Sequence, residues 1–364
     1  MKTNANSLTS LALQKFKKNT TGVLSFWFIV FCGFIAVFSY ALAPDNSSNA
    51  NQMHLEIHSK KPGFKVQMLT IPSEKKLNQS FFNKLLFGNK NQHTEIPISS
   101  YKILNDYLII QTYTESTSES LTKKYPLSLF QNNDVRKFIK TKTFYLGTDR
   151  YGRDLLSRMI VGTRISFFIG FIAVFISLVV GIIIGAIAGY FGGKTDAFIM
   201  WLINITWSIP TLLLVIAITL ALGKGFWQVF IAVGLTMWVE VARVVRGQIM
   251  SAKEMQYVEA AKALGFSNFR IIFKHILPNI IAPVIVISAA NFASAILIES
   301  GLSFLGIGAQ PPIPSWGAMI KDHYSYIILG KAYLAIIPGI AIMLLVMAFM
   351  LIGNALRDAL DVKN

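Results

Sequence analysis

Long apolar runs without a charged side chain alternate with polar segments along this chain. The runs cover residues 22–43, 165–193, 197–223, 225–239, 279–298 and 332–356, and the fourth can extend past Glu240 toward Val245. About 20 apolar residues in a helix cross a hydrocarbon core of about 30 Å. Lipid offers no partner for an unpaired backbone amide, so each span must be a helix. The pattern predicts an all-α integral membrane protein with six transmembrane helices, of which the first is a retained anchor.

The segment between the first two runs has a different pattern. Its apolar residues come in short bursts at 64–71 and 101–113, and Asn105-Asp106 divides the second burst as a two-residue hairpin turn would. Residues 115–124 are rich in Ser and Thr and are typical of a loop. We therefore expect three parts: a first helix within 1–43, a small, partly β domain inserted at 44–143, and a five-helix core at 144–364.

Composition supports a membrane protein. Hydrophobic residues make up 53% and charged residues 14%, whereas soluble chains carry about a quarter charged residues. The net charge of +16 would suit nucleic acid, but such a binder would not hold half its length in uncharged runs, so the expected partner is the lipid bilayer. The single Cys32 excludes an internal disulfide framework and a cysteine-based zinc site.

The distribution of basic residues predicts the orientation. With the N-terminus inside, the inside segments hold thirteen Lys or Arg residues, and the short outside loops hold only Lys224, Lys321 and Lys331. Cytoplasmic loops carry this excess of positive charge. We expect a multi-pass protein of the cell (inner) membrane with both termini cytoplasmic and residues 44–164 outside.

One long inside loop, at about 251–278, is organised. Ser251 to Leu264 is rich in helix formers, and Gly265 suits the end of a helix. Ser267 can cap a second helix that runs to Ile276. The apolar stripe of this second helix is predicted to be Phe269, Ile272, Phe273 and Ile276. The pattern favours a rigid helix–turn–helix, and an amphipathic helix pair lying on lipid headgroups is the alternative.

The sequence of this loop resembles the "EAA" loop of permeases of ATP-binding-cassette (ABC) importers. The matching residues are Glu259, Ala260, Ala261, Gly265, Leu277 and Pro278. The segments 146–166, 295–317 and 356–361 resemble the C-type permease of dipeptide, oligopeptide and nickel importers, so the likeness covers about 144–361. His275 departs from the loop pattern, which has an apolar residue there, and the segment 44–143 is longer than the family leads us to expect.

The resemblance implies a type I ABC importer permease core and a set of partners. These are a B-type permease that completes a heterodimer, two cytoplasmic ATPase subunits and an external substrate-binding protein. The chain would then be a transport subunit and not an enzyme, without a cofactor of its own, because the partner subunits bind ATP. The six loop residues would couple it to the ATPases. Peptides, nickel complexes and related solutes remain open as substrates.

Three further residues are candidates for the translocation path or its gate: Glu299, Pro210 and Ser303. An acidic residue within a span is a functional hypothesis by default. The sequence places Glu240 and Glu299 near span ends, where a charge is cheap, and Pro210 either bends its helix or is merely tolerated.

Two other motifs carry weaker signals. Residues 188–195 come within one residue of a phosphate-binding loop, but they end a membrane span instead of following a strand. His54, Glu56 and His58 would share one face of a strand and could begin a metal site, although a solvated face is far more common.

Three alternatives of other classes compete with the importer. An exporter-type or signalling permease would use the external domain to transmit force, and an ion-driven transporter would need acidic residues at mid-span, of which the sequence pattern shows none. The third alternative is a membrane-anchored enzyme or binding module built on 44–143.

Overall fold

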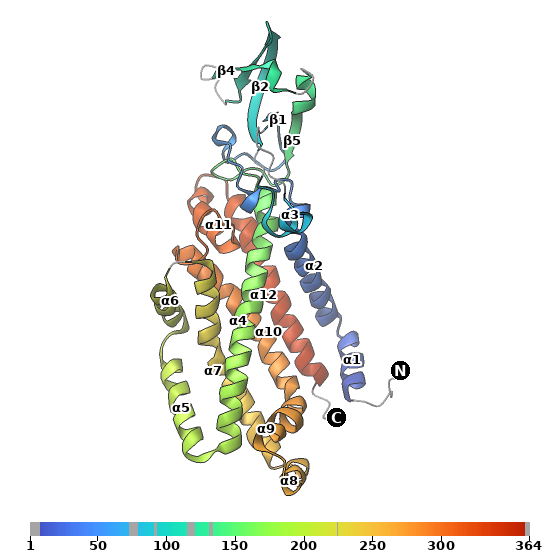
Figure 1. Cartoon of the computed structure of the whole chain (residues 1–364), viewed down its shortest axis with the longest axis vertical. Helices are drawn as coiled ribbons and strands as arrows, with labels where there is room; N and C mark the ends of the chain where they lie inside the picture. Colours follow the sequence, from blue (N-terminus) through green and yellow to red (C-terminus); the bar gives the residue numbers. More distant parts are fainter. Residues whose placement is uncertain are drawn as a thin grey trace. The chain divides into compact units, whose positions relative to one another are not determined.

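The computed structural model describes residues 8–72, 79–90, 93–114, 121–130, 134–223 and 225–360 (Figure 1). The chain forms two compact units. The first contains Met1–Gly33, Ser166–Gln310 and Ile340–Asn364, and the second contains Phe34–Ile165 and Pro311–Gly339. The contacts described below lie within one unit or the other.

Membrane-length helices dominate the described residues. They are α2 (Thr20–Leu42), α4 (Leu155–Phe191), α7 (Phe226–Lys253), α10 (Ile281–Leu305) and α12 (Tyr333–Leu360), preceded by the short α1 (Leu8–Lys18). Five helices are long and apolar enough to cross a membrane, and the bent pair α5 (Gly193–Ser208) with α6 (Thr211–Leu222) passes the same test when its two helices are taken together. Five of the six predicted spans are confirmed within the described chain, and the predicted third span corresponds to the pair α5 and α6, which is bent by 94°.

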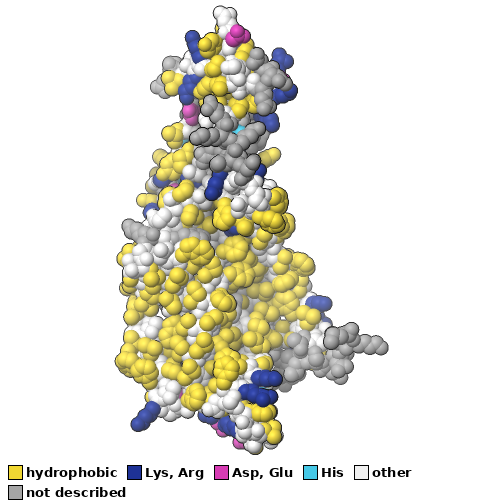
Figure 2. Space-filling view, viewed as in Figure 1, with side chains coloured by type: hydrophobic (Ala, Val, Ile, Leu, Met, Phe, Trp, Pro, Cys, Tyr) yellow, Lys and Arg dark blue, Asp and Glu magenta, His cyan; other side chains and the backbone are white. Residues whose placement is uncertain are grey.

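The outer surface of these helices is apolar. Figure 2 shows hydrophobic side chains over most of the visible face of the helical region. Large residues such as Phe175 and Phe198 are 67% and 62% exposed. A soluble protein rarely exposes continuous apolar surface on this scale, whereas lipid requires it.

Several helices continue past the predicted span ends, because a helix need not stop where the bilayer does. α4 starts at Leu155 rather than 165, and α7 continues to Lys253. Because of this extension Glu240 lies near the middle of α7, although the apolar run of the sequence ends beside it. Glu299 lies in the last third of α10 and its side chain is fully buried.

Helices α4 and α7 approach each other closely along a row of glycines. A Cβ atom added at Gly181 would lie 2.5 Å from the Cβ of Val241, and one at Gly185 would lie 2.5 Å from the carbonyl oxygen of Ala242. At Gly189 the nearest atom would be a carbonyl oxygen of α7 at 2.7 Å. Small residues four apart let membrane helices pack backbone to backbone.

A five-stranded antiparallel sheet lies in the second unit. Its strands are β1 (Phe64–Ile71), β2 (Thr94–Leu104), β3 (Tyr107–Thr112), β4 (Thr122–Pro126) and β5 (Ile139–Phe144), in the order β4-β3-β2-β1-β5. The short helix α3 (Phe81–Phe87) precedes β2. One face of the sheet buries Leu69, Ile98, Leu108 and Ile110 in a core of its own. The predicted β domain after the first helix is confirmed.

The predicted hairpin turn is also confirmed. Leu104 pairs with Tyr107, and Asn105 and Asp106 between them have φ of 47° and 62°. Two successive positive φ values match the twist of the flanking strands. The loop prediction for 115–124 is wrong at its end, because residues from Thr122 onward form β4, while 115–120 lie outside the described residues. The bulk of β4 pairs with β3, which the sequence pattern did not indicate.

Candidate functional site

The predicted helix–turn–helix is present between α7 and α10. It consists of α8 (Gln256–Ala263), α9 (Asn268–Arg270), the π-helix η7 (Ile271–Ile276) and the 3-10 turn η8 (Leu277–Asn279). The predicted start of the first helix at Ser251 is wrong, because 251–253 complete α7 and the chain turns before α8 begins. Pro278 lies in η8, just ahead of α10.

The turn between the two helices forms as its residues predict. Gly265 has φ of 74°, and the amide of Phe266 donates to the carbonyl of Ala261 at 3.2 Å, which closes the end of α8. The hydroxyl of Ser267 then accepts from the amide of Arg270 at 3.4 Å and caps the next helix.

The inner face of the loop packs on the membrane helices. Val258 and Ala261 of α8 are buried together with side chains of α4, α7 and α10 in one apolar cluster. Of the predicted stripe, Ile272 and Ile276 are buried, but Phe269 and Phe273 are 70% and 42% exposed. The π-helix has a wider turn than an α-helix. It therefore brings Ile271, instead of a phenylalanine, to the buried face.

Polar and aromatic contacts fix the loop further. The Tyr190 hydroxyl at the end of α4 donates to the Asn268 side chain at 2.9 Å. Phe266 stacks on His275 with ring centroids 5.5 Å apart, and the Arg270 guanidinium lies 4.1 Å from the centroid of Phe266. His275, which differs from the loop pattern of the family, therefore has a packing partner in Phe266. The loop is held to α4 as well as to α7 and α10.

The outer face of the loop is an exposed tip of mixed character. Glu259 and Ala260 are exposed side by side, Leu264 is 72% exposed, and the rings of Phe269 and Phe273 lie 4.4 Å apart. This combination of a fixed base, an apolar tip and one carboxylate suits a protein partner that covers the tip.

The three path candidates occupy two different places in the first unit. Pro210 lies at the break between α5 and α6 and precedes the first residue of α6. Glu299 accepts a hydrogen bond from the Ser303 hydroxyl at 2.6 Å, and that hydroxyl accepts from the amide of Ala309 at 3.2 Å. The pair therefore ties the end of α10 to the turn that follows it.

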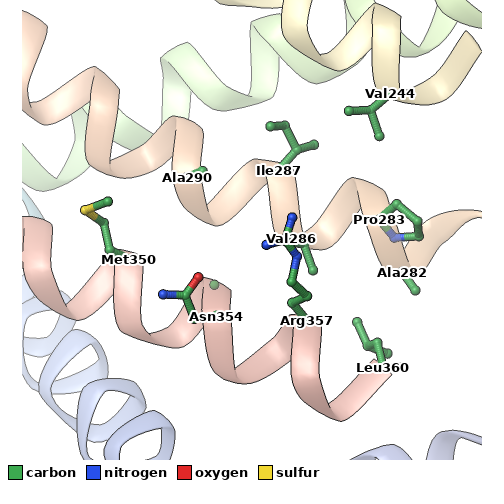
Figure 3. Close-up of a pocket in the computed structure, with 11 residues that line it drawn as sticks. Val244, Ala282, Pro283, Val286, Ile287, Ala290, Met350, Asn354, Arg357 and Leu360 are labelled. Carbon is green, nitrogen blue, oxygen red and sulfur yellow. The ribbon is translucent and has the colours of Figure 1, made fainter. Parts of the chain in front are cut away.

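Cavities lie among the described membrane helices of this unit. One, of about 300 Å³, is lined by residues around the break at Pro210, among them Trp207, Thr211 and Glu240, but not by Glu299 or Ser303. Another, of about 550 Å³, lies between α7, α10 and α12. Figure 3 shows its mainly apolar lining, with Asn354 and Arg357 contributed by α12.

A buried charge network in the second unit escaped prediction. The Asp149 carboxylate, which is fully buried, accepts from the Arg153 Nε at 2.6 Å and from the amide of Tyr151 at 2.8 Å. The buried Arg158 lies 3.7 Å away. The backbone of Ser59, which follows α2 and precedes the sheet, donates to the carbonyl oxygen of Asp149 at 2.8 Å. The network thus ties the base of the inserted domain to the start of α4.

The same network reaches a segment that is distant in sequence. Helix α11 (Trp316–His323) is followed by the 3-10 turn η9 (Tyr324–Ile327). The Trp316 indole donates to the carbonyl of Met159 at 3.1 Å, and Arg150 pairs with Asp322 at 3.2 Å. The sequence marked 146–166 and 295–317 as separate motifs, but only the fold brings the first against residues 316–323.

The contacts of His323 in this segment fit a neutral ring. Its Nδ1 lies 2.7 Å from the carbonyl oxygen of Met319, and its Nε2 accepts from the amide of Arg150 at 3.3 Å. This pattern needs a proton on Nδ1 only. Burial lowers the pKa of His323, because desolvation disfavours the charged ring.

The weaker motifs do not form sites. Gly192 separates the helices α4 and α5, so no strand precedes the glycine-rich stretch at 188–195. His54 precedes a 3-10 turn (Leu55–Ile57) and is buried, while Glu56 and His58 are exposed, so the three do not share a strand face. In the described part of the chain no group of three or more His, Cys, Asp or Glu side chains could hold a metal.

These features define a class of protein. Five apolar helices of membrane length, a bent apolar pair and a structured loop fixed to three of the long helices are what a multi-pass membrane permease needs if a partner moves its helices. Comparison with known proteins agrees: the chain belongs to the family of binding-protein-dependent transport system inner membrane components, whose model matches residues 181–363. The model of the N-terminal transmembrane domain of oligopeptide transport permease C matches residues 7–62.

Individual relatives are similar over most of their length. The dipeptide transport system permease protein DppC of Alkalihalophilus pseudofirmus is 38% identical over 72% of this chain and 84% of its own. The oligopeptide transport system permease protein OppC of Escherichia coli is 43% identical over 60% of this chain and 72% of its own. The glutathione transport system permease protein GsiD of Pectobacterium atrosepticum is 39% identical over 60% of this chain and 72% of its own. The chain is thus a permease of the ABC importer type, and the exporter-type or signalling alternative is not supported.

Proposed function

We propose that this chain imports peptides as one of two permease subunits of an ABC transporter. The single observation that carries the proposal is the loop at 251–278, whose base packs against α4, α7 and α10 while its apolar, acidic tip is exposed. The names of the relatives, which concern dipeptides, oligopeptides and glutathione, support a peptide as the substrate.

The family supports a specific set of partners. A B-type permease completes the translocation path, two ATPase subunits bind and hydrolyse ATP, and an external binding protein delivers the substrate. The loop and both termini face the cytoplasm, and residues 44–164 lie outside. This chain contributes coupling and a path, without a cofactor or bond chemistry of its own.

Coupling follows from the rigidity of the loop. Glu259, Ala260 and Ala261 lie on α8, Gly265 makes the turn, and Leu277 and Pro278 lead into α10. When the ATPases close, a displaced loop moves the helices to which it is packed. The break at Pro210 and the tie between Glu299 and Ser303 lie in helices that would move, so we assign these three residues to the path or its gate.

Substitutions in the loop test the coupling role. Gly265→Pro, or Glu259→Lys combined with Ala260→Asp, should lower peptide uptake at least about tenfold, because they distort the turn or reverse the charge of the tip. The matched control is Glu56→Lys with Leu55→Asp, which changes an equally exposed pair in the second unit.

The assay is uptake of a labelled dipeptide by cells that lack the chromosomal copy and carry each variant on a plasmid. Membrane levels of the protein, measured by immunoblot, should be unchanged. Normal uptake by the loop variants would refute the coupling role, and equal loss in the control would show that the effect is not specific to the loop.

A further inference from the structure

The cavity beside the broken span has a composition unlike a lipid-facing groove. Its volume is about 300 Å³, at the lower end of the range for small-ligand sites. It lies among α5, α6, α7 and α10, and the side chains that give it polar character are Thr206, Trp207, Thr211, Thr236, Glu240 and Ser294. The bend at Pro210 makes room for it, since α5 and α6 diverge there by 94°.

Glu240 is the only acidic residue in the lining of this cavity. Its side chain is exposed near the middle of α7, at the end of the apolar run and less than two helical turns before Arg246. Within the described ranges its carboxylate has no hydrogen bond or ion pair. A carboxylate without a partner in the wall of a cavity suits a cationic ligand.

The two nearby arginines contact groups other than Glu240, and Trp207, the partner of Arg243, itself lines the cavity. The Arg243 guanidinium lies 4.0 Å from the ring centroid of Trp207, in the geometry of a cation–π contact. Arg246 makes two hydrogen bonds with the Asp196 carboxylate, at 2.5 and 2.6 Å. Neither forms an ion pair with Glu240, although Arg243 follows it by less than one helical turn.

The hydroxyl groups of the lining favour hydrogen-bond donors. The Thr206 hydroxyl donates to the carbonyl of Leu202 at 2.9 Å, and the Thr236 hydroxyl donates to the carbonyl of Val233 at 2.8 Å. Each hydroxyl has only one proton, so both oxygens now offer lone pairs alone. Together with the Glu240 carboxylate they form a set of acceptors.

We propose that this cavity binds the α-ammonium group of the transported peptide, with Glu240 as its charge partner and the threonine hydroxyls as acceptors. An ammonium group carries three donors and no acceptor, which matches this lining. The inference rests on the proposed function, because it names the part of the substrate that the path recognises. The cavity would thus give the path a charge-selective contact with the substrate.

The test compares two forms of one peptide. Uptake of a labelled tripeptide and of its N-acetylated form is measured in cells carrying the wild-type chain, Glu240→Gln or Glu240→Asp. The external binding protein affects all three strains alike, so the ratio of free to acetylated uptake isolates the permease. We expect Glu240→Gln to lower this ratio at least about tenfold, because a charged hydrogen bond is lost, and Glu240→Asp to restore most of it.

An unchanged ratio in Glu240→Gln would overturn the proposal, even if total uptake fell. Failure of the proposed function gives a different result, because the wild-type chain would then restore uptake of neither peptide.

A cysteine substitution gives a second measurement that does not depend on the charge. Cys32 is the one cysteine of the chain and is buried, so Ser294→Cys introduces a thiol that reagents can reach selectively. A water-soluble maleimide should modify it, and a free-amine peptide should slow this labelling at least about threefold, since a bound ligand blocks access. The control is Ile231→Cys, which is exposed on α7 outside the cavity. A Ser294→Cys thiol that is no more reactive than the control would show that the cavity faces lipid and would refute the proposal.

Discussion

The close packing of α4 against α7 predicts that a methyl group added at Gly185 destabilises the protein. In Gly185→Ala the new methyl group would lie 2.5 Å from the carbonyl oxygen of Ala242 and 3.0 Å from its Cα. Both are backbone atoms, which cannot rotate away as a side chain can. To restore a normal contact of 3.4 Å, the helices must separate locally by about 0.9 Å.

The magnitude follows from two opposing effects. Alanine favours a helix over glycine by about 1 kcal/mol. Overpacking a tight interface costs about 1–3 kcal/mol, and the separation also weakens the flanking contacts at Gly181 and Gly189. We expect a net loss of about 1–2 kcal/mol for Gly185→Ala and a larger loss when all three glycines are replaced.

Gly247→Ala is the matched control. Gly247 also lies within a helix, α7, but a Cβ atom added there meets nothing within 4 Å. Its replacement should therefore be neutral or slightly stabilising. In thermal unfolding of the purified protein in detergent, the midpoint temperature of Gly185→Ala should be lower than that of the wild type by on the order of 2–6 °C. The midpoint of Gly247→Ala should be unchanged or higher. Equal midpoints for the two variants would refute the argument that backbone contact holds these helices together.

Two further predictions concern the charge network of the second unit. Asp149→Asn leaves the buried Arg153 and Arg158 without their carboxylate and should destabilise the protein by about 3–5 kcal/mol in thermal unfolding. Asp134→Asn, which breaks an exposed pair, should change little. Because burial lowers the pKa of His323, its contribution to stability is fully present above 6.5, the ordinary pKa of histidine, and is lost as the pH falls below it. His323→Gln should flatten the stability profile below pH 6.5, the ordinary pKa of histidine, and an identical slope in the variant would exclude this residue as the cause.

The sequence predicted the elements whose cause is local. A span needs an uncharged run of sufficient length, so the membrane-length helices and the bent pair were visible in the sequence. The turn at Asn105-Asp106 and the cap at Ser267 depend on the conformation of a few neighbouring residues. The order of the motifs likewise indicated the family before any contact was known. The coupling role of the loop residues and the path role of Pro210, Glu299 and Ser303 remain predictions.

Features that depend on the exact course of a helix were predicted less well. The π-helix at 271–276 turns Phe269 and Phe273 outward and Ile271 inward, which a regular period of 3.6 residues cannot indicate. The apolar run of the sequence ends beside Glu240, yet the helix α7 continues for more than three further turns. A charged residue ends an apolar run in the sequence, but it does not by itself end a helix.

The sequence by itself determined which segments cross the membrane, that a β domain follows the first helix, and which loop protrudes, because these depend on hydrophobicity and on backbone preferences of adjacent residues. Only the tertiary structure decided which distant segments meet. It placed Trp316 against Met159, Asp149 between two arginines, and Glu240 in a cavity opened by the break at Pro210. Such contacts arise from packing between residues far apart in the chain, and no local pattern specifies them.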